Sequence, residues 1–132
     1  MVKIIHAKGK RKRATARATL REGKGKVRIN GRLLDIVEPK LARMKMREPL
    51  LLAGDIAGKV NIDVSIFGGG VMSQADAARL AIGKSLVLYN KKLEKLFLDY
   101  DRQLLVADVR RKESAKPNRH GQARAKRQKS YR

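Results

Sequence analysis

Two stretches of the chain alternate between apolar and polar positions. In residues 13–20, alanines and a leucine alternate with arginine and threonine, and residues 60–66 alternate in the same way from Val60 to Ile66. A period of two is typical of a β-strand with one buried face. We therefore predict strands over 13–20 and 60–66. The small side chains Ala14, Ala16 and Ala18 further indicate close packing beneath the first of them.

Other patterns predict two further strands. Residues 22–25 (Glu-Gly-Lys-Gly) have turn composition, and Val27 and Ile29 alternate within residues 26–30 before Asn30-Gly31. This order predicts a hairpin between strands 13–20 and 26–30. The apolar residues 104–109 predict the last strand.

Three regions predict helices. Pro39 and Pro49 each suit the first turn of a helix, so two short helices are expected at about 39–46 and 49–57, with Gly58 as a stop. Ser73 and Asp76 have the spacing of a capping box and predict a helix from there to Tyr89. A shorter helix is expected over 91–100.

The order of these elements predicts an α+β fold of two layers. Its sheet has four strands, and the helices cover one face. We expect one globular domain over 1–112, because 132 residues suit a single domain. Residues 113–132 lack any hydrophobic period, so we expect an extended basic C-terminal tail without a core of its own.

Positive charge is concentrated at both ends of the chain. The formal net charge is +21; residues 1–21 contain eight Lys or Arg and no acid, and residues 110–132 contain ten and one acid, Glu113. Two cationic ends on a nearly neutral body repel each other unless a polyanion binds them. Nucleic acid phosphate is the usual partner, since binding also releases counterions.

Several other functions are disfavoured. The chain has no cysteine, only five scattered aromatic residues, and no apolar run of the ~20 residues that span a bilayer. Reading of single strands by stacking is therefore not expected, nor is membrane insertion, and the expected location is cytoplasmic. His6 and His120 are far apart, which predicts no metal site or other cofactor.

Candidate enzymatic motifs are also incomplete. Gly83-Lys84-Ser85 lacks the glycine that a phosphate-binding loop needs at position 78, and no serine forms a nucleophile elbow. For the glycines 68–70 we expect a tight turn or a close approach to RNA, since Ser73 and Asp76 would satisfy the free N–H groups. We therefore predict that the protein is not an enzyme.

The charge pattern also suggests individual contacts. Arg13 and Arg17, on one strand face, are predicted to bind rRNA phosphate together with residues 10–12; an ion pair of Arg17 with Glu22 is the alternative. Asp108 and Glu113 are expected to pair with Arg110 or Arg111. An architectural DNA-binding protein remains a rival class, which salt titrations on duplex DNA and structured rRNA would distinguish.

Blocks along nearly the whole chain resemble the ribosomal protein S nine family of the small subunit. The blocks are residues 9–18, 26–32, 42–44 and 47–50, the glycines 68–70 followed by Ser73-Gln74-Ala75 and Ala78-Arg79, Asp108-x-Arg110-x-x-Glu113, and a tail end with Ala123-Arg124, Gln128, Ser130 and Arg132. The final residues Gln-Lys-Ser-Tyr-Arg differ from the Ser-Lys-Arg of bacterial members. They are similar to the archaeal and eukaryotic type, and the compact length favours the archaeal one.

The resemblance implies a fold like that of the second domain of ribosomal protein S five. It also implies a place in the head of the small subunit, with rRNA and neighbouring head proteins as partners; nothing indicates a homo-oligomer. The tail end would contact P-site tRNA through Lys129, Ser130, Tyr131 and Arg132. The predicted rRNA-binding residues are Lys10, Arg11, Lys12, Arg13, Arg17, Arg110, Arg111, Lys112, Lys116, Arg119, Arg124, Lys126 and Arg127.

Overall fold

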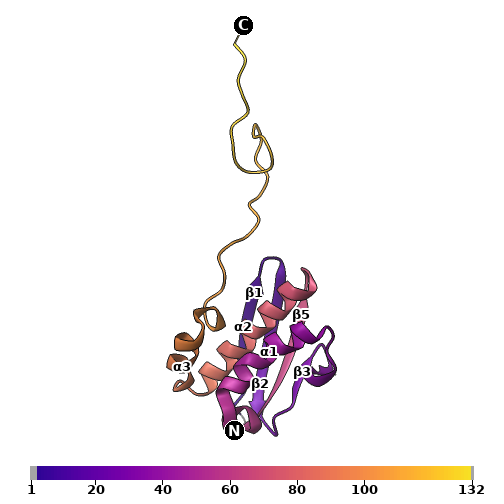
Figure 1. The fold of residues 1–132 in the computed structure, drawn as a ribbon, viewed down its shortest axis with the longest axis vertical. Coiled ribbons are helices and arrows are strands. Elements are labelled where there is room, and N and C mark those ends of the chain that lie inside the picture. Colours follow the sequence, from indigo (N-terminus) through magenta and orange to yellow (C-terminus); the bar gives the residue numbers. More distant parts are fainter. Residues whose placement is uncertain (1–2, 132) are drawn as a thin grey trace.

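A computed structural model describes residues 3–131. The described chain forms one sheet with helices packed on it, followed by a long C-terminal segment that leaves the domain (Figure 1). The strands are β1 (Ile5–Arg11), β2 (Ala14–Glu22), β3 (Val27–Ile29), β4 (Arg32–Leu33) and β5 (Val60–Phe67); the helices are α1 (Lys40–Ala53), α2 (Val71–Tyr89) and α3 (Leu93–Tyr100). Short 3-10 turns occupy residues 34–36, 54–59 and 102–104.

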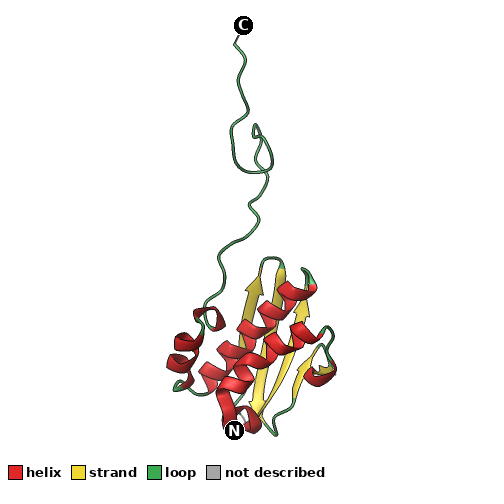
Figure 2. Ribbon diagram, in the orientation of Figure 1, coloured by secondary structure: helices red, strands yellow, loops and turns green. Residues whose placement is uncertain are grey.

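The sheet has the strand order β1-β2-β5-β3-β4. Neighbouring strands are antiparallel except β3 and β5, which are parallel. Helices α1 and α2 lie over one face of this sheet (Figure 2). The predicted α+β fold with helices on one face is confirmed, but the sheet has five strands and not four.

The predicted hairpin is wrong, because β5 lies between β2 and β3. Residues 23–25 lie alongside the start of β5. Gly23 N donates to Lys59 O at 2.9 Å, and Gly25 N donates to Val60 O at 3.1 Å. The apolar side chains of β5 from Val60 to Ile66 are all buried. A strand of this kind is most stable in the sheet interior, with a partner on each side, and this placement separates the two expected hairpin strands.

Strand β1 was not predicted. Its burial alternates only weakly, since Ile5 and Gly9 are the only fully buried positions. It pairs with β2 along its whole length, from Ile5 opposite Leu20 to Arg11 opposite Ala14. The local sequence of β1 gives little indication of a strand, because pairing with β2 stabilises β1 more than burial of its own side chains does.

Two helix predictions need correction. One helix, α1, replaces the two expected short ones and contains Pro49. Its buried residues Ala42, Met46, Pro49 and Ala53 follow one helical face, so burial of this face outweighs the backbone hydrogen bond that proline removes. Helix α2 begins at Val71 after Gly70, with no side-chain cap, so the predicted capping box at Ser73 is wrong.

The predicted last strand over 104–109 is also wrong. Leu104 is fully buried in the 3-10 turn that follows α3, and residues 105–109 form no strand. The apolar run therefore supplies a core anchor for the chain. Helix α3 itself lies within the predicted range of 91–100.

Small residues bring α2 unusually close to the sheet. Ala14, Ala16, Ala18 and Leu20 of β2 are buried as predicted, and they face buried alanines of α2. A Cβ at Gly9 of β1 would lie 2.1 Å from Ala77 O. This close packing holds the β1–β2 turn rigidly beside the start of α2. None of the helices within residues 3–131 has the length and apolar character needed to cross a bilayer.

Candidate nucleic-acid interface

The N-terminal basic cluster lies at the tip formed by β1 and β2. Lys10 and Arg11 end β1, Lys12 and Arg13 form the turn, and Lys12 adopts φ 52°. Arg13 therefore does not share a strand face with Arg17, in contrast to the prediction. Gly68 and Gly69 pack against this turn with positive φ values, since a Cβ at Gly68 would lie 2.7 Å from Arg13 O. The tight turn expected at the glycines 68–70 is confirmed, and it closely approaches the backbone of Arg13.

The first residues of the C-terminal segment lie beside the same tip. Together they enclose a groove of about 1050 Å³, here called the basic groove, which Gly69, Gly70 and Ser73 also line. Glu113 is the single acid among the lining residues. The two basic ends of the sequence thus meet at one place through the cationic lining residues Lys10, Lys12, Arg13, Arg110, Arg111 and Lys112.

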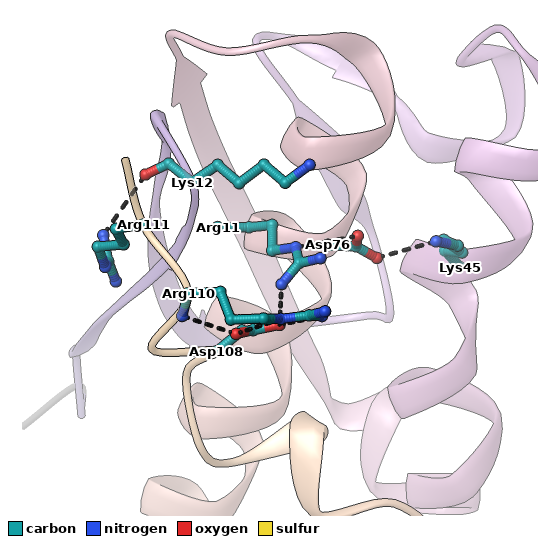
Figure 3. A network of polar contacts seen from close by, with 7 residues as sticks. All are labelled: Arg11, Lys12, Lys45, Asp76, Asp108, Arg110 and Arg111. Carbon is teal, nitrogen blue, oxygen red and sulfur yellow. Dashed lines mark hydrogen bonds and ion pairs between the residues drawn. The ribbon is translucent and has the colours of Figure 1, made fainter. Parts of the chain in front are cut away.

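A set of polar contacts fastens the chain at this point (Figure 3). Arg11 Nη1 donates to Asp108 Oδ2, and Arg110 donates to the same carboxylate through Nη2 at 2.7 Å and its backbone N at 2.9 Å. Asp76 of α2 accepts from Lys45 of α1 at 3.1 Å and lies 3.9 Å from Arg11. We call these residues, with Arg111 and Lys12, the tail-root network.

The tail-root network reduces the number of cations available to a ligand. Arg11 is half-buried and forms ion pairs with Asp108 and Asp76. Arg110 forms an ion pair with Asp108, as expected. Arg111 Nη1 reaches Lys12 O at 3.5 Å. Lys10, Lys12, Arg13 and Lys112 line the groove without an ion pair among the described residues.

The pKa of Asp108 is strongly lowered. The hydrogen bonds from the Arg110 side chain and backbone N are the main cause, and Arg11 adds to them. A contact two residues away can persist in the unfolded chain, whereas Arg11 is 97 residues away and requires the fold. The part of the lowering due to Arg11 therefore stabilises the fold above the ordinary pKa of 3.8, and this stabilisation is lost as the pH falls through the lower folded value.

Replacement of Asp108 by asparagine is expected to loosen the tail root. The amide keeps an oxygen for the backbone N of Arg110 but loses the charge that holds Arg11. Hydrogen–deuterium exchange of residues 106–112 should become severalfold faster at neutral pH. Asp99→Asn, an exposed change on α3, is the control and should leave this exchange unchanged. Equal exchange in wild type and Asp108→Asn would show that the network does not hold the segment.

The segment 113–131 contains no buried residue, yet it is not uniformly extended. It folds back into a loop, with a bridge between Arg119 and Lys126 and a hydrogen bond from Lys116 N to Gln122 O at 2.7 Å. Arg124 pairs with Glu113, the acid that was expected to pair with Arg110 or Arg111, and this contact lowers the pKa of Glu113. The remaining predicted contacts of this segment are exposed or half-exposed: Lys116, Arg119, Lys126, Arg127, Lys129, Ser130 and Tyr131. The predicted contact Arg132 lies outside the described residues.

Arg17 lies apart from the groove, on the sheet face opposite the helices. It is exposed, and its guanidinium is 5.5 Å from the ring centre of Phe67, so it interacts with an aromatic ring and forms no ion pair with Glu22. Lys8, Arg21 and Arg28 also point to this face and were not predicted as contacts. Alternation alone could have placed Arg21 and Arg28, because they continue the polar positions of their strands.

Potential metal ligands are not gathered in the part of the chain that the structure describes. No group of three or more His, Asp or Glu side chains there could hold an ion. His6 Nδ1 lies 3.2 Å from Thr19 Oγ1, and His120 lies near the backbone of Gln128.

Comparison with known proteins gives a consistent result. Residues 9–132 match the family described as ribosomal protein S9/S16. The small ribosomal subunit protein uS9 of Methanococcus vannielii is 51% identical over 134 residues, covering 99% of this chain and 100% of the relative. The uS9 protein of Methanococcus maripaludis strain C7 is 49% identical with the same coverage.

These relatives confirm two expectations from the sequence. Both come from archaea, in agreement with the archaeal type indicated by the tail end. Both are ribosomal proteins by name and not enzymes, as is the matched family. A match over nearly the whole length at this identity shows common descent, and the chain belongs to the ribosomal protein S9/S16 family.

Proposed function

We propose that this chain is a structural protein of the small ribosomal subunit, located in its head and hence in the cytoplasm. It binds rRNA through the basic groove and the segment that leaves it, contacts neighbouring head proteins, and reaches P-site tRNA with its last residues. One observation carries this proposal. The two basic ends, about a hundred residues apart in sequence, meet in one groove from which residues 113–131 project away from the domain.

The groove has the chemistry of an RNA-backbone site. Arg13 and Arg111 offer planar guanidinium groups that can bind phosphate oxygens in pairs, and Lys12 and Lys112 add point charges. Among the described residues, no aromatic side chain lines the groove, so bases would not stack on them there. Phosphate contact and recognition of RNA shape therefore account for binding.

The C-terminal segment suits a narrow site distant from the domain. Nineteen residues, 114–132, can span at most about 60 Å when extended. Ordering them costs ~1–2 kcal/mol per residue in backbone entropy, so phosphate contacts must compensate. The tail can therefore enter a space where no globular domain fits, while the domain remains bound to rRNA.

Deleting residues 129–132 tests the tRNA contact. Assembly of the shortened protein into subunits should remain normal, because the groove and the first part of the tail are retained. Binding of tRNA to the P site of these subunits should weaken by about tenfold, the effect of roughly one charge-assisted contact. Nitrocellulose filter binding of labelled tRNA to reconstituted subunits measures it.

The matched control removes two charges from the tail close to the domain. Lys116→Gln with Arg119→Gln changes the charge by the same amount as loss of Lys129 and Arg132, but should leave tRNA binding near wild type. The opposite outcome is that the shortened protein fails to assemble into subunits, while the subunits that do form bind tRNA normally. In that case the tail end anchors assembly and does not contact tRNA.

A further inference from the structure

We propose that the sheet face opposite the helices is a second RNA-binding surface, which contacts the phosphate backbone of folded RNA independently of the groove and tail. We call it the cationic sheet face, defined by Lys8 of β1, Arg17 and Arg21 of β2, and Arg28 of β3. The inference rests on the proposed function, since it takes rRNA as the ligand. It adds a site and three residues that the charge pattern of the sequence did not identify.

The alternation of burial defines this face. On β2 the residues at 14, 16, 18 and 20 are buried against the helices, so Arg17 and Arg21 project to the other side, where both are exposed. Lys8 lies between half-buried Ala7 and buried Gly9, and Arg28 lies between buried Val27 and Ile29. The helices occupy only the other face (Figure 2). These four cations therefore lie on a surface that no other element of the described chain covers.

The cations of this face are not neutralised within the molecule. Among residues 3–131, all ion pairs involve cations of the helix side or the tail, such as Lys45, Arg47 and Arg79. Lys8 lies directly opposite Arg17 in the β1–β2 register, and Arg17 lies opposite Ser65. Like charges placed directly opposite destabilise a sheet. When a polyanion binds, Lys8 and Arg17 are both attracted to its negative charges, which offsets the repulsion between the two side chains.

Charge complementarity selects the ligand. Besides Lys10, which also lines the basic groove, the face has four cations and one acid, Asp63, which lies opposite Arg28. Exposed or half-exposed hydroxyls of Thr15, Thr19 and Ser65 lie between the cations, and such groups commonly bind phosphate and sugar oxygens. Phe67 is the only Phe, Tyr or Trp of these strands on this face, and Arg17 interacts with it. Stacking on a single-stranded platform needs more rings, so the ligand is the backbone of folded RNA.

A salt titration of rRNA binding tests the proposal. The probe is in vitro transcribed small-subunit rRNA, and the protein is the full chain carrying Lys8→Gln, Arg21→Gln and Arg28→Gln. Each lost phosphate contact should reduce the slope of log affinity against log salt by about 0.9, so the triple variant should have a slope shallower by about two to three. Its melting temperature should stay within a few degrees of wild type, because Lys8→Gln removes the like charge opposite Arg17 whereas Arg28→Gln removes the cation opposite Asp63.

The control has the same charge change elsewhere. Lys91→Gln, Lys92→Gln and Lys95→Gln alter three exposed lysines at and before α3, and the slope should change by less than one. An equal effect of the two triple variants would mean that only net charge matters, and a wild-type slope in the sheet-face variant would mean that RNA does not contact this face. Either result overturns the inference while leaving the proposed function intact. Failure of the wild-type chain to prefer this rRNA over duplex DNA would overturn the proposed function, and the inference with it.

Acetylation of Lys8 distinguishes RNA from a protein partner. Protection of Lys8 by rRNA alone supports the inference. Protection that arises only after the other subunit proteins are added would show that a protein covers this face, and the inference would be wrong.

Discussion

Replacing Gly9 by alanine is expected to cause the largest loss of stability of any small substitution in this domain. A Cβ at this position would lie 2.1 Å from Ala77 O and 2.7 Å from Ala81 N. Both atoms belong to the backbone of α2, which cannot move aside as a side chain can. Strand β1 or helix α2 must therefore shift, at a cost of about 3 kcal/mol or more, a large part of the 5–15 kcal/mol that typically stabilises a domain.

Urea unfolding followed by circular dichroism measures this effect. Gly58→Ala is the matched control, because a Cβ there meets no atom within 4 Å and its φ is not positive. It should unfold within about 0.5 kcal/mol of wild type. If Gly9→Ala were as stable as the control, the close contact between β1 and α2 would not exist as described, and the position of the β1–β2 turn in the basic groove would lose its explanation.

Removing residues 113–132 is expected to abolish most rRNA affinity while leaving the domain folded. No residue of 113–131 is buried, so the midpoint of unfolding should remain within a few degrees of wild type. The deletion removes seven cations and Glu113, a net charge change of six. The slope of log affinity against log salt should become shallower by about five, and affinity at ~0.1 M salt should fall by at least about a hundredfold.

The comparison with Gly9→Ala makes the outcome specific. Gly9→Ala should lose stability and consequently RNA binding, whereas the truncated chain should lose RNA binding alone. Measuring both variants by thermal unfolding and filter binding separates these effects. An unfolded truncated chain would show that the tail is part of the domain and contradict a boundary near residue 112.

Much of the fold was predictable because an element with one buried face has a periodic pattern of apolar residues in its own sequence. Alternation identified β2 and β5. Helical spacing places Ala75, Ala78, Ile82, Leu86 and Tyr89 on one face of α2, and the first four are buried whereas Tyr89 is half-buried. The capping box failed for a physical reason: Gly68 and Gly69 must turn tightly against Arg13, so α2 already begins at Val71. Asp76 then lies inside the helix and pairs with Lys45.

The candidate site was predictable in part. Charge counting placed the contacts at the two ends, but it treated all cations alike. The structure shows Arg11, Arg110 and Arg124 in internal ion pairs. These pairs could not be assigned from sequence, because the long-range partner of Asp108 is 97 residues away.

The sequence by itself determined the composition of the surfaces: two cationic ends, a modest core, and strands and helices that each bury one face. Only the tertiary structure decided which strands are neighbours, that the two ends meet in one groove, and that four cations share the uncovered sheet face. The physical reason is that periodicity records how each element is buried, whereas pairing depends on contacts between distant segments. Here the buried strand β5 took the position between β2 and β3, and β1 became ordered through its pairing with β2.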